Sequence, residues 1–239
     1  MIYVGIDDTD VVGSPGTNKL ARSLIRRVAA EFRCIVAVRH QLLLDRRVPY
    51  TAKNSSASIL FEPRGAGSIE ELGELLRRAM LEWFIEGSDP GLCITGRVPP
   101  EVTRFGRRCQ QQLVQQQAAR DLAAAHDIRL EGLGGTEDGV IGALAAVGLV
   151  AGGNDGRVVN IGNHPDELAG QQDVSLLLRR GVAEVRLVDS GKVVRQGKID
   201  VGKRLRPNYR NGQIVLFVEE TPQGRRAVRI SPGAKCETM

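Results

Sequence analysis

The sequence predicts an α+β protein, because strand and helix patterns alternate in its first half and strand patterns follow one another near its end. Residues 2–6, 34–44 and 54–62 are short apolar or alternating segments typical of strands, and helical patterns follow the first and third of them. After residue 182, four strand-like segments are separated by turn signals such as "RNG". The chain has 239 residues, 42% of them hydrophobic, which is enough for substantial cores.

Two amphipathic helices are expected in the first half of the chain. The first begins at Thr17 or Asn18, either of which is a suitable N-cap, and the second follows Ser68 and its early acidic residues. A strand, "LCITGRV", comes after the second helix. The apolar residues that predict the first helix recur at helical spacing: Leu20, Leu24, Ile25, Val28 and Phe32.

The second half contains a polar helix and a glycine-rich turn. Residues 105–128 are predicted as one helix with a solvated glutamine face, and "LEGLGGTEDGVIGALAAVGLVAGG" as a turn that leads into a helix of small residues. Small side chains permit close backbone approach. We place a domain boundary near residue 100, with an N-terminal part at 1–100 and a second α+β part at 101–239.

Composition indicates the class of partner. The net charge of +5 favours anionic partners such as nucleotides or nucleic acid. The excess of arginine could reflect phosphate recognition, but codon bias is the favoured explanation. No apolar stretch reaches the ~20 residues of a membrane span, and no signal peptide is visible, so we expect a cytoplasmic protein without membrane contact. The cysteines lie far apart and are expected to be reduced and structural: Cys34, Cys93, Cys109 and Cys236.

Three carboxylates, Asp7, Asp8 and Asp10, directly follow the first predicted strand. Like charges so close together repel unless a cation or backbone amides compensate them. Mg²⁺ prefers such hard oxygen ligands, and the helix that starts near Thr17 offers exposed amides to a phosphate. The alternative is a solvated turn whose aspartates cap backbone amides. Spacing alone leaves both interpretations open.

The glycine-rich turn has two interpretations as well. Gly134 and Gly135 could bind phosphate through backbone amides, whereas tight helix packing also explains the small residues that follow. Glu137 and Asp138 are either metal ligands or acids of the first helical turn, and we favour the second. Neither a P-loop nor a G-x-G-x-x-G motif is present.

Few other polar residues stand out. Lys53 and Asn54 precede the third strand, and the lysine could meet phosphates as a point charge, although exposed lysines are common there. His40, His126 and His164 are scattered and form neither a recognisable triad nor a metal-ligand spacing.

Five segments together resemble a known family. "VGIDDTD", "GTNKLARSL", "RRVPYTAKNSSASILFE", "GSDPGLCI" and "GLGGTEDGVIGALAAVGL" occur in the order found in the archaeal tRNA(Ile2) 2-agmatinylcytidine synthetases. The resemblance implies a kinase-like domain combined with a ferredoxin-like domain. It also implies an enzyme dependent on ATP and Mg²⁺, which phosphorylates the C2 oxygen of the wobble cytidine so that agmatine can displace it.

The matching motifs transfer roles to single residues. Asp7, Asp8 and Asp10 take the metal and catalytic role. Lys53 is expected to assist because of its place before the third strand, and not because of the resemblance. Thr17 matches a threonine that can be phosphorylated, although its neighbours differ from the family pattern. The implied nucleotide-binding residues are Asp8, Thr9, Gly16, Thr17, Asn18, Asn54, Gly134 and Gly135.

The resemblance ends at the RNA-capturing part. The family carries a C-terminal OB-fold and a zinc ribbon, whereas the cysteines here cannot build the ribbon and aromatic residues make up only 4%. The resulting prediction is an ATP- and Mg²⁺-dependent phosphotransferase or ligase-like enzyme whose acceptor is open. Its expected partners are a nucleotide and tRNA or another RNA, reached through a partner subunit, with a homodimer as a further alternative. The rival functions are a non-catalytic RNA-binding protein and a nucleotide-gated regulator.

Overall fold

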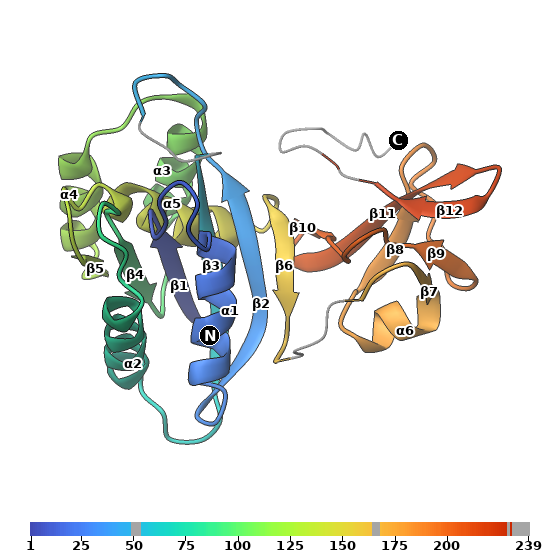
Figure 1. Ribbon diagram of the computed structural model, residues 1–239, viewed down its shortest axis with the longest axis horizontal. Coiled ribbons are helices and arrows are strands. Elements are labelled where there is room, and N and C mark those ends of the chain that lie inside the picture. Colours follow the sequence, from blue (N-terminus) through green and yellow to red (C-terminus); the bar gives the residue numbers. More distant parts are fainter. Residues whose placement is uncertain (49–53, 164–167, 229, 231–239) are drawn as a thin grey trace.

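The first 95 residues fold in the order β-α-β-β-α-β. Figure 1 shows this arrangement in a computed structural model that describes residues 1–48, 54–163, 168–228 and 230. The strands pair antiparallel in the spatial order β4-β1-β3-β2, which is the ferredoxin-like arrangement. The predicted α+β class is therefore confirmed. The elements are β1 (Ile2–Asp7), α1 (Thr17–Arg27), β2 (Phe32–Gln41), β3 (Ser55–Pro63), α2 (Ile69–Glu82) and β4 (Gly91–Thr95).

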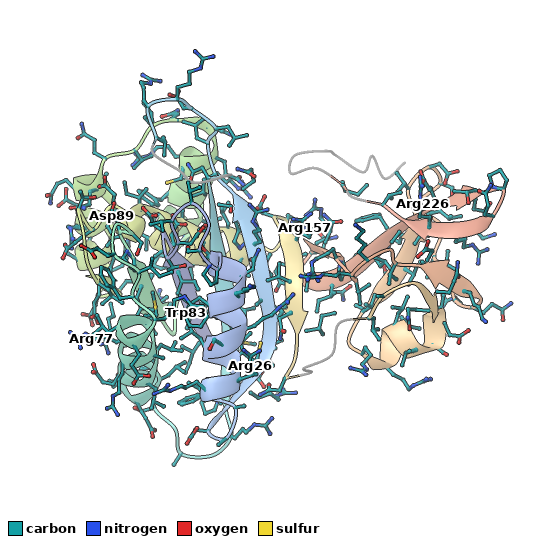
Figure 2. The ribbon with its side chains drawn as sticks, viewed as in Figure 1. Arg26, Arg77, Trp83, Asp89, Arg157 and Arg226 are labelled. Carbon is teal, nitrogen blue, oxygen red and sulfur yellow. The ribbon has the colours of Figure 1, made fainter. Side chains whose placement is uncertain are left out.

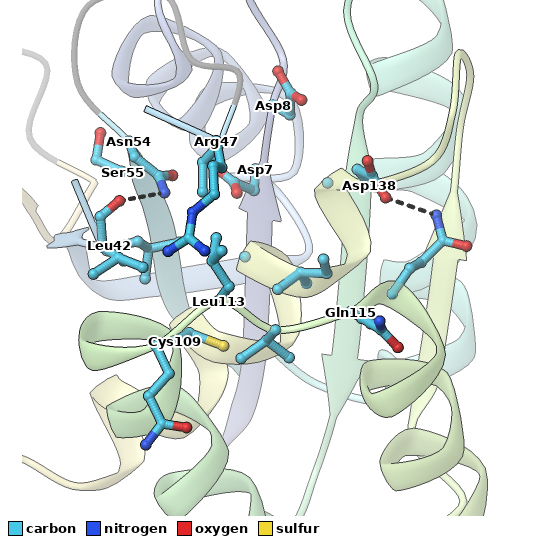
Figure 3. Close-up of a pocket in the computed structure, with 18 of the residues that line it drawn as sticks. Asp7, Asp8, Leu42, Arg47, Asn54, Ser55, Cys109, Leu113, Gln115 and Asp138 are labelled. Atoms are coloured by element: carbon cyan, nitrogen blue, oxygen red, sulfur yellow. Dashed lines mark hydrogen bonds between the residues drawn. The ribbon is translucent and has the colours of Figure 1, made fainter. Parts of the chain in front are cut away.

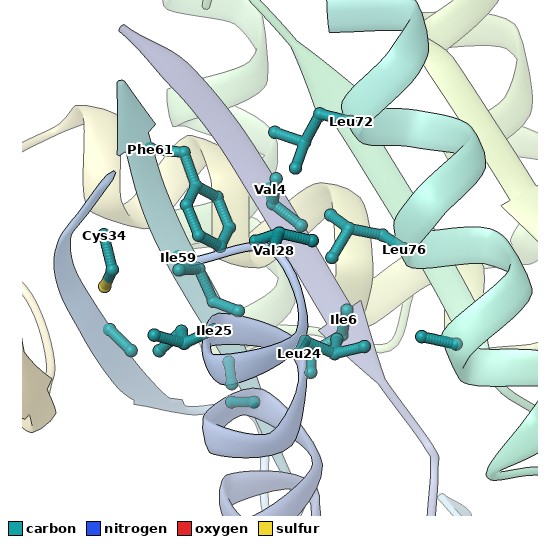
Figure 4. Packing of buried hydrophobic residues seen from close by; sticks show 14 of the residues in the cluster. Val4, Ile6, Leu24, Ile25, Val28, Cys34, Ile59, Phe61, Leu72 and Leu76 are labelled. Atoms are coloured by element: carbon teal, nitrogen blue, oxygen red, sulfur yellow. The ribbon is translucent and has the colours of Figure 1, made fainter. Parts of the chain in front are cut away.

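Helices cover both faces of this sheet. On one face, α1 and α2 bury apolar side chains such as Leu24 and Leu76 against Ile6 and Phe61 of the sheet, as Figure 4 shows. Each such side chain contributes roughly 1.5–3 kcal/mol on burial. On the other face lie α3 (Pro100–Gln111), α4 (Gln116–Ala125) and α5 (Gly139–Ala151), which share a second apolar cluster.

Helix α5 lies directly against the sheet backbone. A Cβ atom on Gly5 of β1 would lie 1.9 Å from the carbonyl oxygen of Ala143, and one on Gly91 of β4 would lie 2.2 Å from that of Gly139. Only glycine fits at such distances. The close approach predicted from the small residues is thus confirmed, and it fixes the start of α5 beside the end of β1 and the start of β4.

The C-terminal third adds a smaller β part, seen to the right in Figure 1. Strand β6 (Arg157–Ile161) pairs with β2 and joins this part through β10 (Asn208–Arg210), so that one sheet runs through the molecule. The edge beyond β4 is β5 (Arg129–Gly132). The remaining elements are β7 (Gln171–Asp173), α6 (Val174–Arg179), β8 (Glu184–Leu187), β9 (Lys198–Asp200), β11 (Gln213–Thr221) and β12 (Gly224–Ala227).

Two helix predictions were wrong in detail. The helix predicted at 105–128 is two helices, because the backbone becomes extended at Gln112. Residues 112–115 line a cavity instead. Helix α1 has Gly16 as its N-cap, since the Thr17 hydroxyl is bonded to Asp10. It also ends at Arg27, so the buried Phe32 starts β2 rather than closing the helix face.

Three further expectations concern the chain as a whole. Cys34, Cys93 and Cys109 are buried free thiols, and Cys236 lies outside the described residues. None of the described helices is long and apolar enough to cross a membrane. The boundary near residue 100 stays a prediction; α3 and α5 from beyond it pack on the sheet formed before it.

Candidate functional site

A cavity of about 370 Å³ opens where β1 and β2 end and β3 begins. The start of α5 and the linker between α3 and α4 close its other sides, as Figure 3 shows. One end is acidic. The opposite wall is largely apolar: Leu42, Leu43, Val48, Leu113, Val114 and Ile141.

Two aspartates at the acidic end have strongly perturbed pKa values. Asp7 lies against α5, where a Cβ atom on Gly142 would come within 1.7 Å of its Oδ2. Burial, followed by the charge of Asp8, raises the pKa of Asp7 to about 8. Burial also raises the pKa of Asp8 to about 6, with further contributions from Asp89, Asp10 and Asp138. The acidic end therefore gathers carboxylates from three separate segments of the chain.

The backbone turns sharply at Asp8, which has a φ of 49°. Aspartate is among the residues that tolerate this left-handed conformation. Beyond the turn, the Thr17 hydroxyl donates to Asp10 Oδ1 at 3.0 Å, and the hydroxyl of the buried Thr9 donates to Thr17 Oγ1 at 3.1 Å. These bonds connect the first residue of α1 to the loop that carries Asp8, Thr9 and Asp10, called the acidic loop here.

The wall opposite carries polar groups among its apolar residues. The Asn54 amide donates to the Leu43 carbonyl at 2.8 Å and so joins the end of β2 to the start of β3. Arg47 is the only cationic side chain in the described lining, and its guanidinium donates to both oxygens of Asp45 at 2.9 and 2.8 Å. Such a cavity can hold a ligand with a flat apolar portion at one end and a cation beside the carboxylates at the other.

The cavity brings together only part of the predicted residue set. Asp7, Asp8, Asp10, Thr17 and Asn54 line it. The lining does not include Thr9, Gly16 and Asn18, which lie in the acidic loop and at the start of α1. Lys53 and His164 lie outside the described residues.

The glycine-rich turn lies beside the cavity lining. A Cβ atom on Gly134 would meet the ring of Phe84, and one on Gly135 would lie 1.7 Å from Asp89 Oδ1. Asp89 in turn accepts from the Thr136 amide at 2.5 Å. These two glycines therefore fold the turn around Asp89, one of the carboxylates that raise the pKa of Asp8.

The favoured interpretation of Glu137 and Asp138 was wrong. The first turn of α5 contains no acidic residue, because Glu137 has a positive φ of 65° and pairs with Arg120, and Asp138 is the N-cap residue. Asp138 lines the cavity, where it accepts from Gln116 at 3.3 Å. Its place in a glycine-rich turn before a helix is the signal that could have assigned it to the site.

The aspartates do not form a ready three-carboxylate metal site. Across the described part of the chain, no group of three or more His, Cys, Asp or Glu side chains is arranged to hold a metal ion. Mg²⁺ in proteins is usually held by one or two carboxylates plus phosphate oxygens and water. After burial, the neighbouring carboxylates Asp89, Asp10 and Asp138 also raise the pKa of Asp8. A divalent cation relieves this repulsion, so the donor chemistry of Asp8 and Asp10 fits Mg²⁺.

A buried hydrogen-bond chain lies behind the cavity and contains a histidine that sequence inspection left unassigned. His40 Nδ1 lies 2.7 Å from Asp155 Oδ2, and its Nε2 lies 2.8 Å from Ser58 Oγ. Gln110 of α3 bridges Asp155 and the Gln41 carbonyl at 3.0 Å each. His40 and Ser58 are both 0% exposed, so this arrangement anchors α3 to the end of β2 and offers no nucleophile to a substrate.

The fold and the cavity define an α+β protein with an acidic site where the first strand of a ferredoxin-like sheet ends. Solved structures of enzymes that act on tRNA have a similar fold, which confirms the resemblance inferred from the sequence. A tRNA fluorescent labeling enzyme is 26% identical, with a TM-score of 0.54 over 62% of this chain and 35% of its own.

The same similarity extends to tRNA(Ile2) agmatidine synthetase, TiaS. Its complex with tRNA(Ile2) and ATP is 26% identical with a TM-score of 0.54, over 62% of this chain and 36% of its own. Apo TiaS is 26% identical with a TM-score of 0.52 over 62% of this chain. The matched region thus spans about a third of those proteins. Neither a protein-family model nor a curated protein matches the chain.

Proposed function

We propose that this protein is an ATP-using enzyme that modifies RNA, with tRNA as the first candidate substrate. The observation that carries the proposal is the acidic cavity in which Asp7, Asp8, Asp10 and Thr17 meet at the end of β1. The similarity to a TiaS complex that contains both tRNA(Ile2) and ATP supports it. The reaction is of the phosphotransferase or ligase type and takes place in the cytoplasm.

The acidic end of the cavity is proposed to bind the polyphosphate of ATP, and the apolar wall is proposed to contact its base. Asp8 and Asp10 would hold Mg²⁺, which supplies positive charge to offset the charge of the phosphates. Asp10 also holds the Thr17 hydroxyl through an accepted hydrogen bond of 3.0 Å. A hydroxyl held by a carboxylate is the pairing of nucleophile and base that covalent catalysis uses. Thr17 Oγ1 is therefore proposed to accept the terminal phosphoryl group of ATP, with its proton passing to Asp10 and ADP leaving.

The remaining predicted residues keep supporting roles in this proposal. Gly134 and Gly135 shape the turn that places Asp89 near Asp8, and Gly16 leaves the N-cap of α1 open beside the acidic loop. Lys53 is proposed as a phosphate contact. Asn54 joins the end of β2 to the start of β3 through its hydrogen bond to the Leu43 carbonyl.

Product analysis tests this proposal directly. The protein is incubated with ATP, Mg²⁺ and tRNA, and phosphorus NMR identifies the nucleotide products. Asp8→Asn should lower ATP turnover at least about 100-fold, because it removes a group that holds charge at the reacting centre. Asp121→Asn is the matched control, since Asp121 is exposed on α4 and accepts only from Gln117 among its described contacts.

The outcomes separate the candidate functions. Turnover that is lost in Asp8→Asn and kept in Asp121→Asn supports the enzyme. ATP that binds without being consumed would identify a nucleotide-gated regulator. RNA binding that persists in a chelator, without any nucleotide binding, would identify a non-catalytic RNA-binding protein.

A further inference from the structure

Charged residues that face each other across neighbouring strands are of opposite sign at five places in the described sheet. A cross-strand pair of opposite charge stabilises a sheet, and a pair of like charge directly opposite destabilises it. The sixth charged pair breaks the pattern: Arg39 of β2 faces Arg157 of β6. The five opposite pairs are Arg33–Glu62, Asp173–Lys198, Asp200–Arg226, Glu219–Arg226 and Glu220–Arg225.

Arg39 connects this like-charge pair to the acidic cavity. Its guanidinium donates twice to the hydroxyl of Ser55, a residue of the cavity lining, at 2.9 and 2.6 Å. Burial lowers the pKa of Arg39, and the charge of Asp10 opposes that effect. The pair is therefore a partly buried positive charge at the edge of the cavity, on the same side as the acidic loop.

The positive charge continues away from the cavity across the sheet. Arg157 faces Asn208 of β10, and Arg210 lies two residues further along that strand. The guanidinium of Arg210 donates to the carbonyl of Tyr209 at 2.9 Å and to that of Asn154 at 3.5 Å, at the end of the strand. Figure 2 places Arg157 between the two parts of the molecule. The row formed by Arg39, Arg157 and Arg210, called the arginine row here, crosses three neighbouring strands and so spans roughly 10 Å.

Helix α1 borders the arginine row. Arg22 of this helix donates to the Val159 carbonyl of β6 at 2.9 Å, which adds another guanidinium beside Arg157.

The part beyond the arginine row is strongly basic. Residues 168–228 contain twelve Lys and Arg against six Asp and Glu, a net charge of +6, whereas the whole chain carries only +5. Three of those acids are engaged by arginines of the same part: Glu184, Glu219 and Glu220. The segment "KRLRPNYR", from Lys203 to Arg210, carries four of the cations and leads back to β6. Positive charge thus increases along the path from the cavity to the C-terminal part.

We propose that the arginine row is a track for the phosphodiester backbone of RNA, leading from the basic C-terminal part to the acidic cavity. The row is longer than one phosphate group and suits consecutive phosphates of a strand. A bound backbone places negative charge beside Arg39 and Arg157, and delivers a nucleotide to the cavity edge. This inference rests on the proposed function, because it assumes that the substrate of the cavity is part of an RNA.

Binding of a fluorescently labelled tRNA transcript, followed by anisotropy over a series of salt concentrations, tests the arginine row. Arg157→Gln should weaken binding about tenfold and reduce the salt dependence by about one phosphate contact. Arg104→Gln is the matched control. It also removes one positive charge, but from an exposed arginine of α3 that pairs with Glu101 outside the arginine row and the C-terminal part, so its affinity should stay within about twofold.

Thermal unfolding of the same variants separates a binding role from a structural one. Arg157→Gln keeps a polar side chain at the same place in β6, so a binding role predicts that affinity falls while the variant unfolds cooperatively like the parent. The proposal is overturned if this variant binds tRNA like the parent, if Arg104→Gln loses as much affinity, if the affinity loss is explained by loss of the folded state, or if the parent does not bind RNA.

Titration with Mg²⁺ and ATP keeps this inference distinct from the proposed function. If ATP is consumed but Arg157→Gln binds tRNA like the parent, the RNA track is contradicted and the proposed enzymatic function is supported. If Arg157→Gln weakens tRNA binding but ATP does not bind at all, the RNA track is supported and the proposed function is contradicted.

Discussion

Gly142→Ala should disable the acidic end of the cavity by displacing Asp7. The new methyl group would lie 1.7 Å from Asp7 Oδ2, 2.4 Å from its Cγ and 2.9 Å from its Cβ. Rotating the carboxylate cannot relieve all three contacts, because the Cβ atom is fixed to the backbone of β1. Either Asp7 and the end of β1 move or α5 moves, and α5 is already in backbone contact with Gly5 and Gly91.

The cost of this overpacking is about 1–3 kcal/mol of folding free energy, measured by urea unfolding. A displacement of about 1 Å at a reacting centre can cost on the order of 100-fold in rate, so ATP turnover should fall by about that factor. Gly96→Ala is the control, because the nearest atom to its new methyl group would be Ile69 Cδ1 at 3.8 Å. If Gly142→Ala has the same free energy of unfolding and the same rate of ATP turnover as the parent, the close packing of α5 on Asp7 is incorrect.

Two further predictions concern stability away from the cavity. Burial alone would raise the pKa of Asp155, but the hydrogen bond and charge of His40 and the bond from Gln110 hold it below its usual value. That stabilisation is present above about pH 4 and is lost as the pH falls through the lower folded-state pKa. Asp155→Asn should therefore weaken the fall in the free energy of unfolding at acidic pH. If the free energy of unfolding falls as steeply in the variant as in the parent, the role of His40 is contradicted. Ser68 accepts from the Glu71 amide at 3.0 Å as the N-cap of α2, and Ser68→Ala should cost about 1 kcal/mol in urea unfolding without changing ATP turnover; a loss below roughly 0.3 kcal/mol would argue against the cap.

Local patterns predicted most of the first 95 residues correctly. The strand at Ile2, the capped helix after Ser68 and the acidic loop between strand and helix are all specified by neighbouring residues. Strands β5, β6 and β10 have no comparable local signal. They form because a partner strand supplies their hydrogen bonds, as β2 does for β6.

The candidate site was only partly visible in the sequence for a similar reason. Asp7, Asp8 and Asp10 lie within four residues of one another, so the sequence shows them as a cluster. In the structure they line one end of the cavity. Asp89 and Asp138 join them because α5 packs on β1 and β4 without intervening side chains. The arginine row was hidden as well, since Arg39 and Arg157 meet only through strand pairing.

Calorimetric titration with ATP tests the central claim, that the acidic cavity holds a divalent cation together with a polyphosphate. The account predicts that ATP binds in Mg²⁺, that binding is lost in a chelator, and that Asp8→Asn weakens it at least about tenfold while Asp121→Asn leaves it intact. Binding of equal strength with and without Mg²⁺, or an Asp8→Asn protein that binds like the parent, would contradict the account.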